Sequence, residues 1–439
     1  VFTVRNSASA AISTTFGVAD AAYGTEPMLV TLTRTSASTY SFEMSSRSGG
    51  AAYSTTIYST DPVDAITFFM GNQNDGAGAR NMYVNGLTMR SAKARTVLDG
   101  VSGWRMLSAP AAATVADFLD PLWTQGGGSS DYPAGPPNVY TWDGAAWIPF
   151  TSDFTGASLH AGDALLVYAF EDVDYDGTRD FPVTLSTAGP EFPGATLSMA
   201  NESQPDAFRM IGNPFASPIS FDALSRSGFT DAAYIWDPAA NNGAGSWVSY
   251  VAGTGMGDLT GGLIAPFQAF FMQANASSSG VTISPSHRNG HARFYGKQPA
   301  SDADRSLIGS LRLHLSNGEH SNSAWITIGA TGSLERQVPG DAVELHPFND
   351  SYVQLSTRKG DKLFDIAHVP PAASWYSIPL DIAATEAGSY ALRVTHLDLP
   401  ETLRVWIRDF ETQTETELRS GVTISLSLDA EGRSSAASK

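Results

Sequence analysis

One short loop carries the strongest chemical signal in the sequence. The segment from Asp172 to Asp180 reads Asp-Val-Asp-Tyr-Asp-Gly-Thr-Arg-Asp. Carboxylates at its first, third and fifth positions, glycine at the sixth, a backbone carbonyl at the seventh and an acid at the ninth are what a hard cation such as Ca²⁺ requires. We predict a structural calcium site formed by Asp172, Asp174, Asp176, Thr178 and Asp180. The alternative is a solvated acidic turn.

The loop differs from an EF-hand in two ways. Its twelfth position is Val183 instead of a bidentate glutamate, and the flanking segments predict strands where an EF-hand has helices. The neighbouring sequence has no residues typical of a substrate pocket. We therefore expect the cation to have a structural role.

Other residues with chemical potential give weaker signals. His287 and His291 would face one metal ion on a helix, but Asn-Gly between them predicts a turn, so we expect surface or packing roles. The chain has 0 Cys, which excludes disulfides and thiolate chemistry. The common nucleophile, phosphate, zinc-protease and dinucleotide strings are absent from the sequence. We predict a protein that is not an enzyme; a glycosidase-type pair of acids, which meets only in the fold, stays open.

The elements that must position these residues belong to a unit that occurs twice. Three segments recur in the same order, each with a partner further along the chain: 104–110 with 208–214, 140–147 with 234–247, and 164–170 with 268–274. Each copy begins with an apolar segment ending in Pro, continues with a Tyr-x-Trp-Asp strand and ends with an apolar strand. This order indicates a duplicated β region.

The Tyr-x-Trp pairs of the two copies have two interpretations. Alternate residues of a strand share a face, so Tyr140 can stand beside Trp142, and Tyr234 beside Trp236. Such pairs could stack on sugar rings and bind glycans. Core packing explains the same residues more simply, because aromatic side chains contribute much of the buried area of a core.

The whole chain predicts an all-β, multidomain fold with β-sandwich-like domains. We expect an N-terminal β domain at 1–97, with strands at 28–33, 40–44, 66–70 and 82–89, then the duplicated region at 98–298, with repeats at about 98–200 and 201–298. A short helix is predicted at 114–119, and Gly-rich long loops at 126–137 and 239–246. A C-terminal β-sandwich at 299–429 and a polar tail at 430–439 complete the chain. Its eight predicted strands are 311–315, 324–328, 352–355, 363–369, 376–382, 390–394, 403–408 and 422–428.

Composition limits the partners. The 44 acidic and 26 basic residues give a net charge of −18, which repels nucleic acid and anionic lipid. No stretch has the apolar length of a membrane span, so we expect a chain that does not span the membrane. The chain starts at Val1 without Met, which favours a mature product whose export signal has been removed; a piece cut from a longer protein would start in the same way.

The chain resembles the non-catalytic β-rich regions of large proteins exported by the type IX secretion system of the Bacteroidota and their relatives. The resemblance covers about residues 98–428 and is carried by the acidic loop and by 103–108, 212–218, 262–271, 390–392 and 405–409. It implies export to the cell surface or the extracellular space, and such regions accompany enzymes, adhesins and surface-layer proteins alike. The separate C-terminal sorting domain of these proteins is missing here, so we interpret the tail ending at Lys439 as a candidate cleavage point.

These observations together predict an exported, non-enzymatic structural or adhesive protein. It would lie on the cell surface or form the subunit of an extracellular fibre, associating with itself or with other cell-surface proteins. The Ala/Ser/Thr-rich segment 1–22 could add as a strand to the open sheet edge of a neighbour. The alternative is a carbohydrate-binding or enzyme-associated module of a secreted protein.

Overall fold

The structure is a computed structural model, and it describes residues 28–34, 39–46, 52–58, 94–187, 197–202, 204–289, 307–371, 375–400, 402–410 and 413–428. Strands make up 48% and helices 4% of the well-placed residues, which confirms the predicted all-β, multidomain class. The chain divides into two compact units, Val1–Thr88 and Met89–Lys439. The predicted segments 1–22, 66–70 and 430–439 lie outside the described residues.

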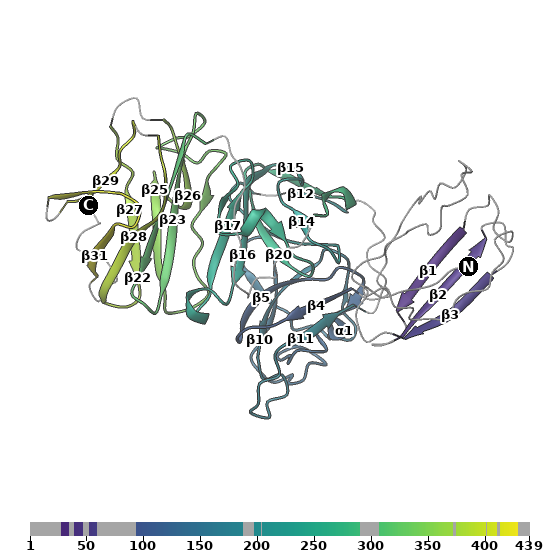
Figure 1. The fold of residues 1–439 in the computed structure, drawn as a ribbon. Helices are drawn as coiled ribbons and strands as arrows, with labels where there is room; N and C mark the ends of the chain where they lie inside the picture. Colours follow the sequence, from purple (N-terminus) through teal and green to yellow (C-terminus); the bar gives the residue numbers. More distant parts are fainter. Residues whose placement is uncertain are drawn as a thin grey trace, which may run out of the picture. The chain divides into compact units, whose positions relative to one another are not determined.

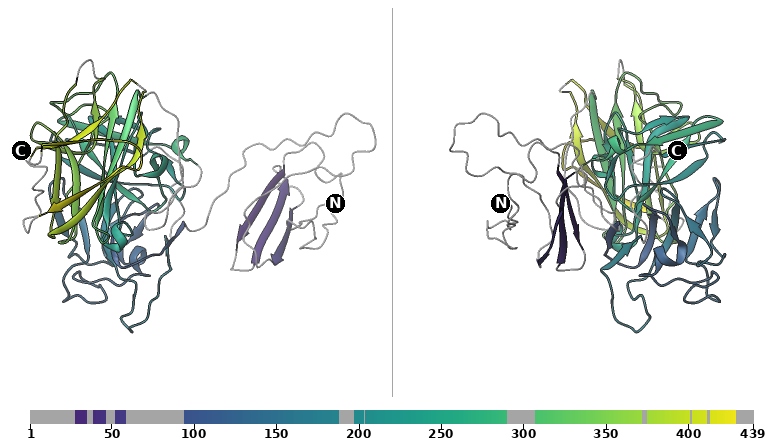
Figure 2. Two further views of the ribbon diagram at one scale, coloured as in Figure 1. Left: turned by 60° about the vertical axis from the view of Figure 1, so that its left-hand side comes forward. Right: turned by 90° about the vertical axis from the view of Figure 1, so that its right-hand side faces the viewer.

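The first unit contains an antiparallel meander (Figure 2). Its strands are β1 (Met28–Arg34), β2 (Thr39–Ser46) and β3 (Ala52–Tyr58), paired in the order β1-β2-β3. β1 and β2 confirm the strands predicted at 28–33 and 40–44 from their period-two alternation. The strand predicted at 82–89 lies outside the described residues.

The two repeats share one strand topology. The first has the sheet β5-β10-β7-β8, and the second has β13-β20-β16-β17, extended by β18. The first repeat consists of β4 (Arg95–Leu98), β5 (Gly103–Ser108), β6 (Ala113–Thr114), α1 (Val115–Leu119), β7 (Val139–Trp142), β8 (Trp147–Pro149), β9 (Ser158–Leu159), β10 (Ala164–Ala169) and β11 (Val183–Ser186). The second consists of β12 (Leu197–Glu202), β13 (Phe208–Gly212), β14 (Ile219–Ser220), β15 (Ser225–Ser227), β16 (Phe229–Asp237), β17 (Ser246–Val251), β18 (Met256–Gly257), β19 (Leu263–Ile264), β20 (Ala269–Ala274) and β21 (Ser278–Ile283).

Smaller pairings repeat as well. The pair β4–β11 of the first repeat corresponds to β12–β21 of the second, and β6–β9 corresponds to β14–β19. β4 therefore belongs with the first repeat, whereas the predicted boundary near residue 97 assigned most of it to the N-terminal domain. The predicted short helix is α1, where the Thr114 hydroxyl accepts a hydrogen bond from the Asp117 amide at 3.0 Å.

The third predicted sequence match is wrong by one residue. Ala164 of β10 lies opposite Ser108, and Ala269 of β20 lies opposite the equivalent Gly212. The structural partner of Ala164 is therefore Ala269, where the sequence alignment placed Gln268. All six residues of β20 are buried, so the strand offers no apolar-to-polar alternation that would fix its register from the sequence.

The C-terminal part is one curved sheet of eight strands that forms a half-barrel (Figure 1). The order is β27-β25-β26-β23-β22-β28-β31, with β24 paired to β26, and β23 and β26 run parallel. The strands are β22 (Gly309–Ser316), β23 (Ser321–Ile328), β24 (Ala342–Val343), β25 (Val353–Lys359), β26 (Lys362–Val369), β27 (Leu380–Ala384), β28 (Gly388–Asp398) and β31 (Thr423–Leu428). A ribbon of β29 (Trp406–Asp409) and β30 (Thr414–Glu417) belongs to a segment that packs against the sheet core. Each of the eight predicted segments overlaps one strand, and the layering is sandwich-like.

Candidate functional site

A shared aromatic core joins both repeats to the C-terminal sheet. Each repeat has a core of its own, and the opposite faces of their central sheets meet in a further cluster with residues of β24 and β26. Tyr234 and Trp236 lie in this cluster, with 1% and 2% of their surfaces exposed. The Trp236 ring centroid lies 4.6 Å from that of Phe348, and the Tyr234 hydroxyl accepts a hydrogen bond from the Val343 amide at 2.8 Å. Burial raises the pKa of Tyr234 well above its usual value.

The burial of Tyr234 and Trp236 corrects one prediction. Their ring faces are covered by protein, so they cannot stack on a sugar, and the core-packing interpretation holds for this pair. Tyr140 and Trp142 are half-buried against the same cluster. The Trp142 indole donates a hydrogen bond to the Phe208 carbonyl at 2.7 Å. For these two residues glycan stacking stays a prediction.

The acidic loop brings three of its five predicted ligands together. Asp172, Asp174 and Asp176 each offer a carboxylate oxygen within 4.8 Å of the others. The Asp176 amide donates to Asp172 and Asp174, both at 3.2 Å, so the chain curls around its own carboxylates. Thr178 donates its hydroxyl to Asp176 at 2.5 Å, and this bond lowers the pKa of Asp176. Asp180 instead accepts a hydrogen bond from the Val173 amide at 2.7 Å.

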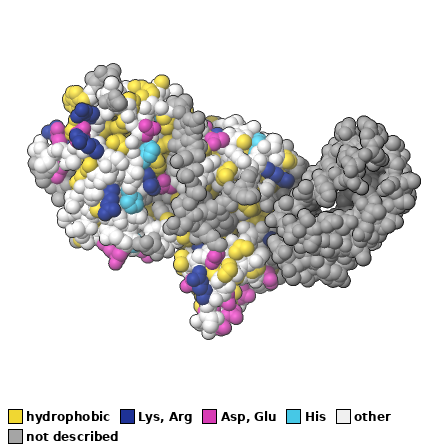
Figure 3. Space-filling view, viewed as in Figure 1, with side chains coloured by type: hydrophobic (Ala, Val, Ile, Leu, Met, Phe, Trp, Pro, Cys, Tyr) yellow, Lys and Arg dark blue, Asp and Glu magenta, His cyan; other side chains and the backbone are white. Residues whose placement is uncertain are grey.

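The ends of the loop are held by charge and by aromatic contacts. Arg179 donates to the Gly100 carbonyl and lies 3.5 Å from the Glu171 carboxylate. Tyr175, at positive φ, packs its ring 4.9 Å from that of Trp123. Figure 3 shows acidic side chains gathered on the lower, projecting part of the first repeat. The loop thus presents converging oxygen ligands from a fixed base, which suits a hard divalent cation.

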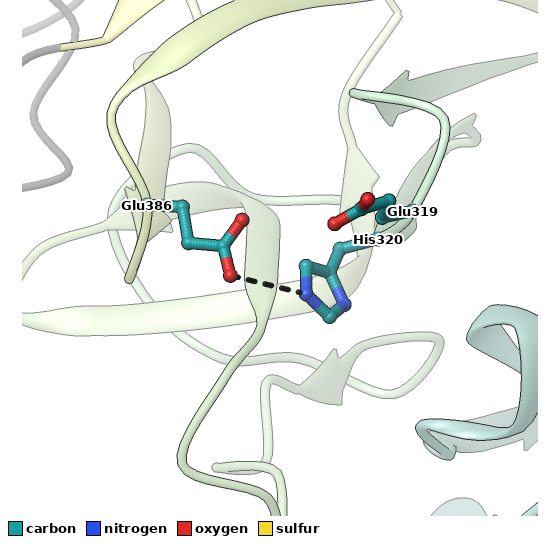
Figure 4. A group of neighbouring side chains, drawn as sticks. All are labelled: Glu319, His320 and Glu386. Atoms are coloured by element: carbon teal, nitrogen blue, oxygen red, sulfur yellow. Dashed lines mark ion pairs between the residues drawn. The ribbon is translucent and has the colours of Figure 1, made fainter.

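A second cluster, which the sequence analysis missed, lies at one end of the C-terminal sheet. Glu319 and His320 come from the turn between β22 and β23, and Glu386 from the turn between β27 and β28 (Figure 4). The His320 Nε2 lies 3.7 Å from Glu386 and 2.9 Å from the Ser351 hydroxyl. The Ser351 hydroxyl donates to Glu386 at 3.0 Å. No sequence pattern connects these turns, because the chain brings them together only when the sheet forms.

The hydrogen bonds assign this second cluster a structural role. The Ser351 hydroxyl gives its proton to Glu386, so the His320 tautomer that satisfies both bonds is the one that carries its proton on Nε2. A nucleophilic triad needs the opposite arrangement, with the acid on Nδ1 and Nε2 ready to accept the serine proton. The His320 Nδ1 is buried without a hydrogen-bond partner among the described residues. If the His320 Nε2 bound a metal, the ring proton would move to Nδ1, which has no acceptor among the described residues.

Two acids meet where the second repeat contacts the C-terminal sheet. Glu344, next to β24, accepts a hydrogen bond from Gln354 at 3.0 Å, and Asp365 of β26 accepts one from the Ser249 hydroxyl of β17. Burial raises the pKa of Asp365 to about 7, and burial together with the Asp365 charge raises that of Glu344 well above its usual value. The Asp258 carboxylate also raises the Asp365 pKa. This contact therefore holds a proton near neutral pH.

We predict that this acid pair makes the protein less stable at alkaline pH. A carboxyl whose pKa is higher in the folded state stabilises the fold when protonated, and this contribution is lost as the pH rises from the unfolded value toward about 7 for Asp365. Asp365→Asn should raise the free energy of unfolding by about 1–3 kcal/mol at pH 8 and change it little at about pH 3, below the unfolded pKa of the carboxyl. Urea unfolding at both pH values measures this. Asp361→Asn, at an exposed turn, is the control, and an equal effect of Asp365→Asn at both pH values would contradict the prediction.

The remaining candidates have local structural roles. His287 Nδ1 accepts a hydrogen bond from the Ser284 amide at 3.1 Å and so caps a short helical turn, while His291 lies outside the described residues. The long loop at 239–246 contacts the C-terminal sheet, because the Asn241 side chain accepts hydrogen bonds from the amide and hydroxyl of Ser321. The loop at 126–137 is tied to the residues just before it by Asp131, which accepts a hydrogen bond from the Thr124 hydroxyl at 2.8 Å.

Comparison with protein-family models, with curated proteins and with solved structures finds no match for this chain. Among the described residues, no helix combines the length and hydrophobicity that crossing a membrane requires. Function is therefore inferred from the residues and contacts of the chain itself.

Proposed function

We propose that this protein is an exported, non-enzymatic structural or adhesive protein, displayed on the outer cell surface or polymerised as the subunit of an extracellular fibre. The observation that carries the proposal is the shared aromatic core. The aromatic residues that could have bound a ligand, above all Tyr234 and Trp236, are buried in the contacts between the repeats and the C-terminal sheet. Such a core makes three β-sheet layers one continuous body, which suits a load-bearing subunit better than a ligand-binding groove.

Several direct bonds reinforce this continuity between the repeats. The Gln268 side chain donates to the Met106 carbonyl at 2.8 Å, and the Ser108 hydroxyl donates to the Asn213 carbonyl at 2.9 Å. The Trp247 indole of the second repeat donates to the His346 carbonyl of the C-terminal part at 2.9 Å. The first two bonds are buried and the third is exposed, and together they fix the orientation of neighbouring parts, as a filament subunit requires.

Negative-stain microscopy and analytical ultracentrifugation of the full chain test this proposal. We expect fibres or concentration-dependent oligomers, because strand addition between copies always leaves a free donor at one end of the assembly and a free acceptor at the other. A strictly monodisperse monomer at high concentration would remove the fibre version. Binding of the fluorescent protein to cells would then test the adhesive version.

The alternative function is a carbohydrate-binding or enzyme-associated module. It depends on Tyr140 and Trp142, which are only half-buried, and on the neighbouring loop at 126–137, where 51% of Tyr132 is exposed. A glycan array with the wild-type protein and Trp142→Ala decides this point. Binding that Trp142→Ala removes would favour the alternative, and a flat array would leave only the structural proposal.

Within the same proposal we infer that the acidic loop binds Ca²⁺ to rigidify the first repeat. Without a cation the carboxylates of Asp172, Asp174 and Asp176 repel one another in a chain of net charge −18. Calcium at a hundredfold excess over its dissociation constant should stabilise the fold by about 2.7 kcal/mol. Asp174→Ala should abolish this difference between chelator and calcium, as measured by thermal melting. Asp361→Ala is the control, and identical wild-type melting curves in chelator and calcium would return the loop to a solvated turn.

A further inference from the structure

The strand β31 is an edge of the C-terminal sheet, and its own residues carry none of the features that discourage pairing. In the described part of the chain it pairs only with β28, through the register from Thr423↔Arg393 to Leu428↔Gly388. Its sequence, Thr-Ile-Ser-Leu-Ser-Leu, contains no charged residue and no proline. Natural sheets usually protect such an edge with Lys, Pro, a bulge or a covering segment, because its free amides and carbonyls accept further strands.

The opposite edge of the same sheet, formed by β27, does carry features that discourage strand addition. β27 carries Asp381, which forms an ion pair with Arg358 of the neighbouring strand, and Pro379 directly precedes it. A charge and a proline are two of the devices that discourage strand addition. The contrast indicates that one end of the sheet is closed to further pairing and the other is open.

The side chains of β31 define what an added strand must look like. Ile424 and Leu426 pack on the C-terminal core and remain partly exposed, whereas Ser425 and Ser427 on the other face are exposed. A strand laid against this edge would cover the apolar row if it carried large apolar residues at alternate positions and small polar residues between them. It should also carry no acidic residues, because copies of a chain at −18 repel one another.

The chain contains such a segment near its N-terminus. From residue 12 to residue 18 the sequence reads Ile-Ser-Thr-Thr-Phe-Gly-Val: the alternate positions 12, 14, 16 and 18 hold Ile, Thr, Phe and Val, and Ser, Thr and Gly lie between them. The segment has no charge. It precedes β1, so it lies in a different compact unit from β31.

We propose that β31 accepts residues 12–18 of a second copy of this chain as an added strand. The inference rests on the proposed function and names its contact. Because donor and acceptor are different surfaces, the contact is head-to-tail and generates an open fibre instead of a closed dimer. Main-chain hydrogen bonds along the edge supply affinity, and burial of Ile424 and Leu426 by Ile12, Phe16 or Val18 supplies register. Added salt should promote assembly, since it screens the charge repulsion between copies.

Disulfide trapping tests the contact cleanly, since the natural chain has 0 Cys. A Ser425→Cys chain is mixed with a Ser13→Cys, Thr15→Cys or Gly17→Cys chain at fibre-forming concentration and oxidised. We expect at least one mixture to give a covalent pair containing one chain of each kind. Ser389→Cys, on the inner strand β28 directly opposite Ser427, is the control and should give none.

Substitutions that place charge on the β31 edge provide a second test of the contact. Ser425→Lys with Ser427→Lys should raise the protein concentration at which fibres first form by about tenfold or more, whereas Ser389→Lys should not. Fibres that form without any mixed disulfide, or with links between two Ser425→Cys chains only, would overturn the strand assignment and leave the proposed function standing. A chain that never self-associates would overturn this inference together with the fibre version of the function, whereas the adhesive version would remain.

Discussion

Replacing Trp236 with Ala is expected to lower the free energy of unfolding of the second compact unit by about 3–5 kcal/mol. The ring is 2% exposed and lies between Trp247, at 5.6 Å between ring centroids, and Phe348, so its loss leaves a cavity where the second repeat meets the C-terminal part. Chemical denaturation followed by circular dichroism measures the effect.

Trp375→Ala is the matched control for this prediction. The Trp375 side chain is 92% exposed, so its removal should change the free energy of unfolding by about 0.5 kcal/mol or less. Equal effects of the two substitutions would contradict the assignment of Trp236 to a shared core. A large loss for Trp236 alone would support a continuous body and weigh against a ligand role for this residue.

Replacing Lys359 with Met is expected to cost about 3–5 kcal/mol, the second large effect. The Lys359 ammonium lies 2.6 Å from the Asp341 carboxylate, and the two side chains are 1% and 0% exposed. The ammonium also donates to the His368 carbonyl at 2.8 Å. Without the lysine, Asp341 remains buried with no cation, although it still accepts hydrogen bonds from the amides of Val338 and His368. Urea unfolding at neutral pH measures the loss.

Two variants separate the buried charge from a general effect of removing lysine. Lys362 forms an ion pair with Asp206 at the same 2.6 Å, but these side chains are 36% and 59% exposed, so Lys362→Met should cost about 0–1 kcal/mol. Adding Asp341→Asn to Lys359→Met should recover part of the loss, because the unpaired charge disappears. A double variant less stable than Lys359→Met alone would show that the Asp341 carboxylate stabilises the fold without its cation.

The sequence alone was sufficient for many of the strands and for the duplication, although it missed β3, β24 and β30. Local alternation and turn residues predicted β1, β2 and the C-terminal strands, and the three recurring segments predicted two repeats that the structure shows with one strand order. Local spacing also predicted the convergence of Asp172, Asp174 and Asp176, because ligands within one short loop need no tertiary contact to meet.

When both faces of a strand are apolar, the sequence does not show what covers each face. Tyr234 and Trp236 share a face, as period two requires, but alternation does not reveal whether that face meets solvent, glycan or another sheet. The same ambiguity produced the one-residue error at β20. A strand buried on both sides has no polar positions to mark its register, so only its pairing with β13 fixes it.

Local sequence thus determined which segments are strands, which segments repeat and which loop can gather carboxylates, since each depends on neighbours a few residues apart. The tertiary structure alone decided the partners of Lys359, His320 and Asp365, which come from distant strands and turns. It also decided that the repeats and the C-terminal sheet share one core, and that β31 lies at an open edge. Burial and edge position are properties of packing between segments, and no local pattern specifies which segments will pack together.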